Sequence, residues 1–273
     1  MLKINNLQQR YNLEFVKIDQ KHDFYQFFDL IFIFLCLLLS CKTKIMESNH
    51  KHVTCENCLS RKNSLFACFD GQNLDELNHH KSCSYYKKNQ GLFLEGSFPR
   101  GVFCLNEGKV KIFARGDEGK EQIIHIATTG EIIGYRAMFS GDPYKVSAQT
   151  LEDSNVCFIA KEDFLNMLDT NATLRNSIMK ELSKELGERA IFITNMAQKP
   201  VRERLAFSLV MLHGIYKDEM INLSREDLAN FVGTATETLI RLLKEFKEDN
   251  YIEIHTRKIE VLNLDKLIHL AGK

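Results

Sequence analysis

The stretch from Leu223 to Phe246 constrains the fold more than any other part of the chain. Its sequence, LSREDLANFVGTATETLIRLLKEF, predicts two short helices joined by a tight turn. Ser224 and Thr234 each precede an acidic residue by three positions, which predicts a capping box at the start of each helix. The apolar residues recur at helical spacing and are expected to be buried: Leu228, Phe231, Val232, Leu239, Leu242 and Leu243. This pattern is typical of a helix-turn-helix.

The outward face of the predicted second helix is partly polar. Arginine pairs with guanine and glutamate accepts from cytosine in the major groove, so Arg241 and Glu237 are expected to read bases. In the alternative interpretation, Glu237 only completes a capping box and Arg241 is a solvated charge. The predicted DNA-binding residues are Ser224, Thr234, Thr236, Glu237, Ile240 and Arg241.

Composition neither requires nor excludes nucleic-acid binding. The 273-residue chain is 44% hydrophobic, which is enough for two compact cores. Its formal net charge is zero, and from Gln198 onwards the basic and acidic residues are equal in number. A large non-specific attraction to phosphates is therefore not expected, and DNA binding depends on the motif and on local charge placement.

The N-terminal region contains a short apolar segment, Leu30 to Leu39. Ten apolar residues are too few for a membrane-spanning helix, which needs roughly 20. Residues 1–45 are interpreted as an extension upstream of a start at Met46, or as a targeting-like segment. A membrane anchor is the alternative, and N-terminal sequencing of the native protein separates the two. No membrane association is expected of the rest of the chain.

Between Tyr85 and Val156 the sequence predicts an antiparallel β domain. Short β-type segments alternate there with glycine-bearing turns, which favours a sandwich, roll or barrel. The predicted strands are 92–94, 101–105, 109–114, 122–127, 146–149 and 156–159.

A helical half follows the β domain. Residues 161–168 predict a short helix, and residues 174–198 a long one with apolar residues at three- and four-residue steps. That apolar seam favours a homodimer contact, with packing against the chain's own β domain as the alternative. Pro200 is expected to mark a hinge, before a helix at 201–215, the helix-turn-helix, and a hairpin at 251–263 with Thr256 and Arg257 near its tip. A hairpin in that place is a wing.

This order of elements resembles the Crp/Fnr superfamily of bacterial transcription regulators, from about Cys55 to Gly272. The matching segments are Gly130–Gly134 (GEIIG), Ala148–Asp153 (AQTLED), Thr236–Thr238 and Arg241–Leu243. The resemblance implies an α+β fold with a cyclic-nucleotide-binding-like antiparallel β-roll (46–170), a dimerisation helix (171–198) and a winged helix-turn-helix (199–273), after the extension at 1–45. It also implies a cytoplasmic homodimer that binds palindromic double-stranded DNA and contacts RNA polymerase.

Cyclic-AMP binding is not expected despite this resemblance. Cyclic-nucleotide-binding members hold the sugar with a glutamate and the cyclic phosphate with an Arg-Ser pair. Tyr135 and the pair Tyr144 and Lys145 stand at the corresponding places here. A cyclic phosphate needs a cluster of positive donors, which Arg136 and Lys145 could in principle supply, but the glutamate and the Arg-Ser pair are missing.

The Fnr-type branch implies a different cofactor, a 4Fe-4S cluster held by a C-x2-C-x5-C motif and a fourth cysteine. Cys55, Cys58 and Cys157 match that pattern, but Ser64 stands at the third place. Cys68 is the nearest thiol and completes the candidate metal site. The alternatives are a three-thiolate remnant, a zinc site, or inert cysteines. Cys83 and Cys104 are expected to be thiols without chemistry, because neither has a partner at ligand spacing.

The sequence therefore predicts a DNA-binding regulator rather than an enzyme. It contains no glycine-rich phosphate loop, nucleophile elbow or HExxH motif. Two alternatives remain: a ligand-sensing module that regulates a protein partner without binding DNA, and a regulator that responds to a small molecule without any cluster.

Overall fold

The computed structural model describes residues 54–217 and 219–272, and these all belong to one compact unit. The candidate extension at 1–45, with its apolar segment 30–39, lies outside the described residues. Within the described part, no helix is long and apolar enough to span a membrane.

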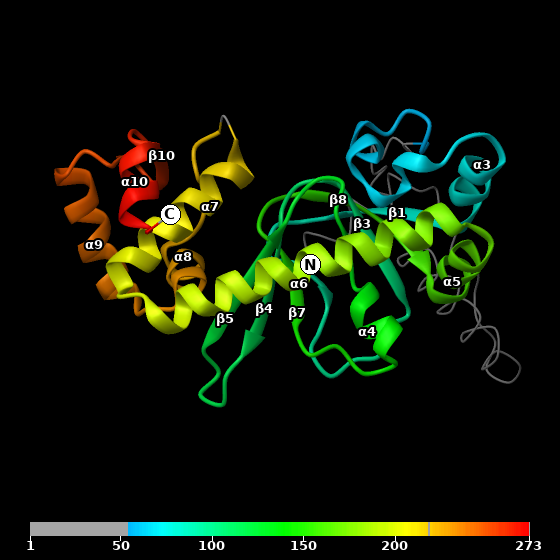
Figure 1. The fold of residues 1–273 in the computed structure, drawn as a ribbon, viewed down its shortest axis with the longest axis horizontal. Helices are drawn as coiled ribbons and strands as arrows, with labels where there is room; N and C mark the ends of the chain where they lie inside the picture. The colour runs from blue at the N-terminus through cyan, green and yellow to red at the C-terminus, as the bar shows by residue number, and fades with distance from the viewer. Residues whose placement is uncertain (1–53, 218, 273) are drawn as a thin grey trace, which may run out of the picture. The chain divides into compact units, whose positions relative to one another are not determined.

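Two antiparallel four-stranded sheets face each other and form the β domain (Figure 1). The first sheet has the order β1-β8-β3-β6 and the second β2-β7-β4-β5. A core of apolar side chains from both sheets, including Leu105, Ile112 and Val156, fills the space between them. The strands are β1 (Lys81–Tyr86), β2 (Gly91–Phe93), β3 (Gly101–Glu107), β4 (Val110–Arg115), β5 (Glu121–Ala127), β6 (Ile132–Ile133), β7 (Ser147–Thr150) and β8 (Ser154–Ala160).

All six predicted strands are present, but β1 and β6 were not predicted. Strand β1 has the sequence KSCSYY, which is too polar to stand out as a strand, and β6 is two residues long. Strand β1 is nevertheless stabilised, because it pairs along its whole length with β8. The β domain therefore begins at Lys81, several residues before the sequence pattern indicated.

An N-terminal segment and several helices cover the outer face of the first sheet. Phe66 of this segment and Phe164 of α5 lie in one core with Val102 of β3. These elements are η1 (Leu59–Asn63), η2 (Leu65–Cys68), α3 (Gly71–His80), α4 (Tyr135–Ser140), α5 (Lys161–Thr170) and the start of α6 (Ala172–Gln198).

The C-terminal helices and the hairpin share a third core, in which Leu205, Phe231 and Phe246 are almost fully buried. These elements are α7 (Val201–Tyr216), α8 (Arg225–Val232), α9 (Thr236–Glu248), β9 (Ile252–His255), β10 (Lys258–Val261) and α10 (Leu264–Leu270). The predicted hinge residue Pro200 is the N-cap of α7, where its fixed φ of −56° suits a helix start.

Candidate nucleic-acid interface and sensor site

The first helix of the pair, α8, starts as the sequence predicts. The Ser224 hydroxyl accepts the backbone N–H of Asp227 at 2.9 Å and donates to the Asp227 carboxylate at 2.6 Å. Gly233 ends the helix at φ +72°, in the left-handed region that glycine adopts without strain. The predicted N-cap at Ser224 is therefore confirmed, and Asp227 binds the Ser224 hydroxyl rather than its backbone N–H.

The predicted cap at Thr234 is wrong. Helix α9 begins at Thr236 with Ala235 as its N-cap, and no side chain caps it. Thr234 is buried within the turn, where its backbone N–H donates to the Ala229 carbonyl. The turn thus runs one residue longer than the capping pattern indicated, so Glu237 lies in the first turn of α9 without a capping partner at Thr234.

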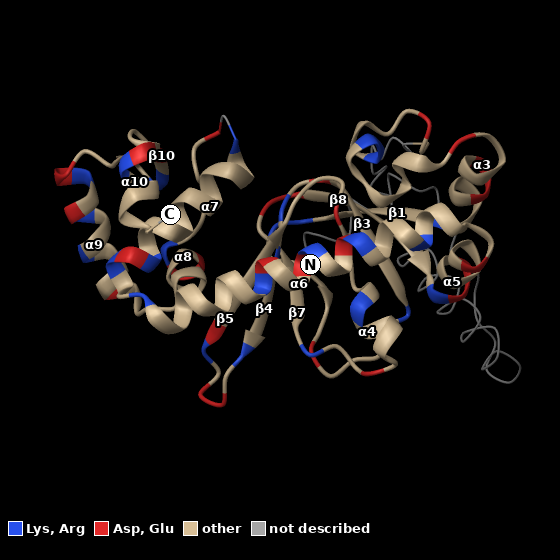
Figure 2. Ribbon diagram, in the orientation of Figure 1, with Lys and Arg blue, Asp and Glu red and all other residues tan. Residues whose placement is uncertain are grey.

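Helix α9 has one buried and one exposed side. Leu239, Leu242, Leu243 and Phe246 are buried, as predicted. Glu237, Ile240 and Arg241 are exposed on the other side, and Thr236 is half-buried at the helix start. Both signs of charge occur along α9 (Figure 2). The helix thus presents exposed charged and apolar side chains on the side opposite its buried face.

The predicted wing is present. Strands β9 and β10 pair in register, and Thr256 adopts φ +58° at the tip beside the exposed Arg257. Ile252 and Ile259 anchor the hairpin in the core that holds α9. The hairpin therefore has a fixed place beside the helix-turn-helix.

A contact with strand β4 holds the start of α8, which no sequence pattern indicated. The nearly buried Lys111 ammonium lies 2.8 Å from carboxylate oxygens of both Asp227 and Glu121. Burial by itself would lower the pKa of Lys111, but these two carboxylates raise it above its usual value. Gln122 of β5 also donates to the backbone carbonyl of Asn230 at 2.8 Å. Residues more than 100 positions apart are thus joined.

The β domain contains a cavity of about 330 Å³ between its second sheet, α4 and α6. Its wall is mainly apolar, with Ile112 and Ile133 among the lining residues. The buried Tyr144 ring stacks on Phe93 at 3.9 Å, and burial raises the pKa of Tyr144 to about 12. The Lys145 side chain is 84% exposed and lies 3.9 Å from Asp142. The wall therefore has no cationic pair fixed at the place of the Arg-Ser pair.

One side of this cavity is connected to the long helix α6. The Tyr135 hydroxyl donates to a Glu185 carboxylate oxygen at 2.8 Å, and Arg136 lies 3.6 Å from the other oxygen. Burial, followed by the charge of Glu185, raises the pKa of Tyr135. Arg189 donates to the Ile124 carbonyl one turn further along α6. The cavity wall and α6 are thus joined by a hydrogen bond and an ion pair.

The glutamate of the GEIIG segment makes stability depend on pH. Glu131 accepts from Thr128 and lies 2.7 Å from His125 Nε2. Burial alone would raise the pKa of Glu131, but His125 and then Thr128 lower it below its usual value. This stabilisation is present above the unfolded-state pKa and is lost as pH falls through the lower folded-state pKa.

We expect Glu131→Gln to flatten the decrease in unfolding free energy between pH 6 and pH 3, measured by urea titration. The exposed Glu118→Gln is the control, and equal slopes in both variants would contradict the assignment.

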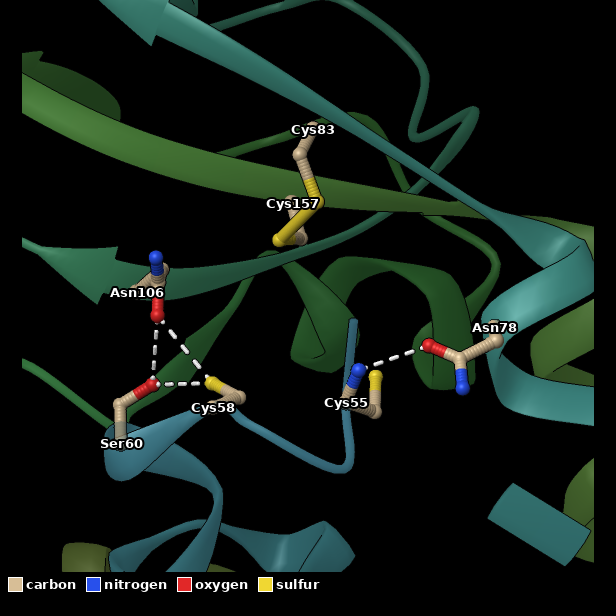
Figure 3. The surroundings of a disulfide bond; sticks show 7 residues. All are labelled: Cys55, Cys58, Ser60, Asn78, Cys83, Asn106 and Cys157. Atoms are coloured by element: carbon tan, nitrogen blue, oxygen red, sulfur yellow. Dashed lines mark hydrogen bonds between the residues drawn. A yellow bond between two sulfur atoms is a disulfide. The ribbon is translucent and has the colours of Figure 1, made fainter. Parts of the chain in front are cut away.

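The cysteines are arranged differently from the expected metal site (Figure 3). Cys157 forms a disulfide with Cys83, so the prediction that Cys83 has no chemistry is wrong. The pairing was missed because the two residues are 74 positions apart and meet only through the pairing of β1 with β8. Cys58 donates to Asn106 at 3.1 Å. Cys55 is buried, with its backbone N–H donating to Asn78.

Ser64 and Cys68, the two residues in doubt at the third ligand place, have separate structural positions. Ser64 caps η2 by accepting the backbone N–H of Phe66, and its hydroxyl donates to the Arg61 carbonyl at 2.8 Å. Cys68 is exposed at the end of η2, and its thiol donates to the Leu65 carbonyl. Ser64 therefore caps the start of η2, at the place where the Fnr-type motif has a cysteine.

These features define a class of protein: a two-sheet sensor domain joined by a long helix to a winged helix-turn-helix. Two family models match this division, a cyclic nucleotide-binding domain over residues 83–171 and a Crp-like helix-turn-helix domain over residues 203–270. The chain belongs to the Crp/Fnr family and is a DNA-binding transcription regulator of that type.

Relatives and solved structures agree with this assignment. The chain is 27% identical over 237 residues to the fumarate and nitrate reduction regulatory protein of Vibrio cholerae, covering 84% of this chain and 94% of that one. It is 29% identical over 193 residues to the transcriptional activator protein anr of Pseudomonas aeruginosa, covering 68% and 79%. FixK2 from Bradyrhizobium japonicum has the same fold, with a TM-score of 0.64 at 18% identity over 70% of this chain and 96% of that one.

The resemblance to the Fnr-type branch implies an iron-sulfur cluster, but the thiols as arranged do not fit one. Among the described residues, no group of three or more His, Cys, Asp or Glu side chains is placed to hold a metal ion. The Cys157 sulfur is bonded to Cys83, and Cys68 is turned to a backbone carbonyl at the surface. In this disulfide-bonded state the predicted set Cys55, Cys58, Cys68 and Cys157 does not supply four thiolate ligands.

Proposed function

We propose that this regulator is a cytoplasmic homodimer that reads palindromic DNA through α9 and passes a redox signal from its β domain to that helix. The observation that carries the DNA-reading part is the exposed face of α9, where Glu237, Ile240 and Arg241 project while the opposite side is buried. A face that docks on a protein would be expected to be more apolar at its centre. The mixture of Glu237 and Arg241 therefore favours a groove over a protein partner.

The homodimer is proposed on α6. Its apolar seam divides into two parts: Leu174 and Ile178 are buried in the chain's own core, whereas Leu186 and Ile193 are 73% and 64% exposed. Met179, Leu186, Ala190, Ile193 and Ala197 follow steps of three, four and seven residues, the spacing of a coiled-coil seam. Pairing of two copies along this seam would bury these residues and place two α9 helices for successive major grooves. In this arrangement RNA polymerase is the proposed transcriptional partner.

Arg241→Ala tests whether the exposed side of α9 reads bases. Selection from a random DNA library with the wild-type protein is expected to give a two-fold symmetric site with half-site centres about one helical turn apart. On that site the variant should lose about 1 to 3 kcal/mol of binding free energy and tolerate any base at one position of each half-site. Fluorescence anisotropy against the four variants of that base pair measures both effects.

Lys244→Ala is the matched control, since Lys244 is an exposed cation on the same helix one turn further on. It should weaken binding to all sequences about equally, as expected of a phosphate contact, and reduce the salt dependence. Equal loss on every base variant for Arg241→Ala would contradict base reading. No enrichment of any sequence would favour the protein-partner alternative.

Two observations support the redox part of the proposal. One is the similarity to the fumarate and nitrate reduction regulatory protein. The other is that five cysteines lie on or beside the first sheet: Cys55, Cys58, Cys83, Cys104 and Cys157. A small molecule in the 330 Å³ cavity is the second candidate signal, because Tyr135 and Glu185 connect that cavity to α6. Anaerobic purification followed by iron and sulfide assay and visible absorption tests for a bound cluster as the redox signal. A colourless, iron-free protein that binds DNA leaves the thiols or a small molecule as the signal.

A further inference from the structure

Three cysteines lie side by side across the first sheet. Cys157 of β8 is in register with Cys83 of β1 on one side and with Cys104 of β3 on the other. Residues directly opposite on antiparallel strands project from the same face, so the three side chains form one row. Two of them, Cys83 and Cys157, are joined as a disulfide.

The three positions differ in access to solvent. Strand β1 is at the edge of the sheet, and Cys83 is partly exposed there. Cys157 is buried, with 8% exposure. Cys104 is partly exposed like Cys83, but its strand β3 lies between β8 and β6. A reagent from solution therefore reaches the disulfide at Cys83, on the edge strand, before it reaches the buried Cys157.

We propose that Cys83 and Cys157 form a reversible thiol–disulfide switch that exchanges with low-molecular-weight disulfides and dithiols. In the oxidising direction the Cys83 thiolate attacks a disulfide such as oxidised glutathione and releases one thiol. The Cys157 thiolate then attacks the Cys83 sulfur of the mixed disulfide and releases the second. One external disulfide is reduced to two thiols, and two protein thiols are oxidised to one disulfide with loss of two protons to the released thiolates. A dithiol reverses the reaction by attack at Cys83.

The position of the pair connects it to the rest of the regulator. Oxidation ties the edge strand β1, which follows the N-terminal segment and α3, to β8. Strand β8 ends at Ala160, the N-cap of α5, and α5 is followed almost directly by α6. Oxidation also removes Cys157, the position that the family resemblance assigns to a cluster, from the free thiols. The effect on DNA binding rests on the proposed function, but the thiol chemistry does not.

Mass spectrometry of the full chain tests the thiol chemistry. The protein is equilibrated in glutathione buffers from fully reduced to fully oxidised, quenched with acid and alkylated with a maleimide. We expect a reversible loss of two alkylation sites and one linked peptide pair containing Cys83 and Cys157. Cys83→Ser and Cys157→Ser should each abolish the linked pair, whereas Cys104→Ser, the matched control on β3, should retain it.

Three results would overturn the switch. One is full alkylation of Cys83 and Cys157 under conditions that already glutathionylate the exposed Cys68. Another is linkage of Cys157 to Cys104 in place of Cys83. The third is a disulfide that dithiothreitol opens only after the protein has unfolded, which circular dichroism detects and which identifies a purely structural bond.

DNA binding of the two states is measured separately. The oxidised and reduced wild-type proteins should differ in affinity by about 5-fold or more, the usual lower range for coupled sites. Cys83→Ser should show no difference. Equal affinities with a closing disulfide would refute the coupling to α6, and an absence of specific binding in both states would refute the proposed DNA reading while leaving the switch intact.

Discussion

Ile193→Glu is expected to convert the regulator to a monomer and to lower its affinity for a two-half-site DNA by about 100-fold or more. Ile193 is 64% exposed near the middle of the outer half of the α6 seam. In a homodimer Ile193 of one protomer would face Ile193 of its partner. The substitution would therefore place two carboxylates together in an apolar contact. Loss of the dimer removes the gain from binding two half-sites at once.

Analytical ultracentrifugation and anisotropy on the selected site measure the two effects. Ile191→Glu is the matched control, because Ile191 is 54% exposed on the same helix but lies away from the seam. It makes the same chemical change two residues away and should leave a dimer with nearly unchanged affinity. A variant at Ile193 that remains dimeric, or equal losses at both positions, would move the dimer contact off α6.

Phe246→Ala should produce the largest loss of stability, about 3 to 5 kcal/mol, because it empties a fully buried aromatic site. Phe246 has no exposed surface, and its ring packs edge-on against Tyr251 at 5.3 Å between centroids. The Arg202 guanidinium lies over the Phe246 ring, 5.3 Å from its centroid. Phe246 thus holds α9, α7 and the start of the wing together, and its loss should abolish DNA binding at 37 °C.

Chemical unfolding followed by circular dichroism gives the free-energy change. Phe98→Ala is the control, since Phe98 is 68% exposed and its removal should change stability by no more than about 0.5 kcal/mol. A loss below about 1 kcal/mol at Phe246 would mean that the C-terminal core relaxes around the cavity. That result would contradict the inference that Phe246 holds α9, α7 and the start of the wing in place.

Local patterns predicted the C-terminal half well because its elements are determined by short-range chemistry. The N-cap at Ser224, the apolar side of α9 and the wing all depend on residues within a few positions of each other. The wrong N-cap prediction at Thr234 also concerns residues within a few positions of each other. The backbone bond from Thr234 to Ala229 keeps Thr234 in the turn, and the helix starts one residue later than the capping pattern indicated.

The β domain was predictable as a series of strands but not as an arrangement. Hydrophobic alternation and glycine turns indicate where strands occur, whereas the order β1-β8-β3-β6 depends on contacts between distant segments. The polar strand β1 exists only because β8 pairs with it. The same holds for Lys111, whose partner Asp227 lies 116 residues further along the chain.

The sequence by itself determined the class of protein, because a helix-turn-helix and its wing are written in local spacing. Only the tertiary structure decided the state of the cysteines. Ligand spacing indicated Cys55, Cys58, Cys68 and Cys157, but strand register places Cys83 and Cys104 beside Cys157 and leaves Cys68 at the surface. Spacing detects partners within one loop or one helix turn, and the register of two strands 74 residues apart is set by the packing of the whole sheet.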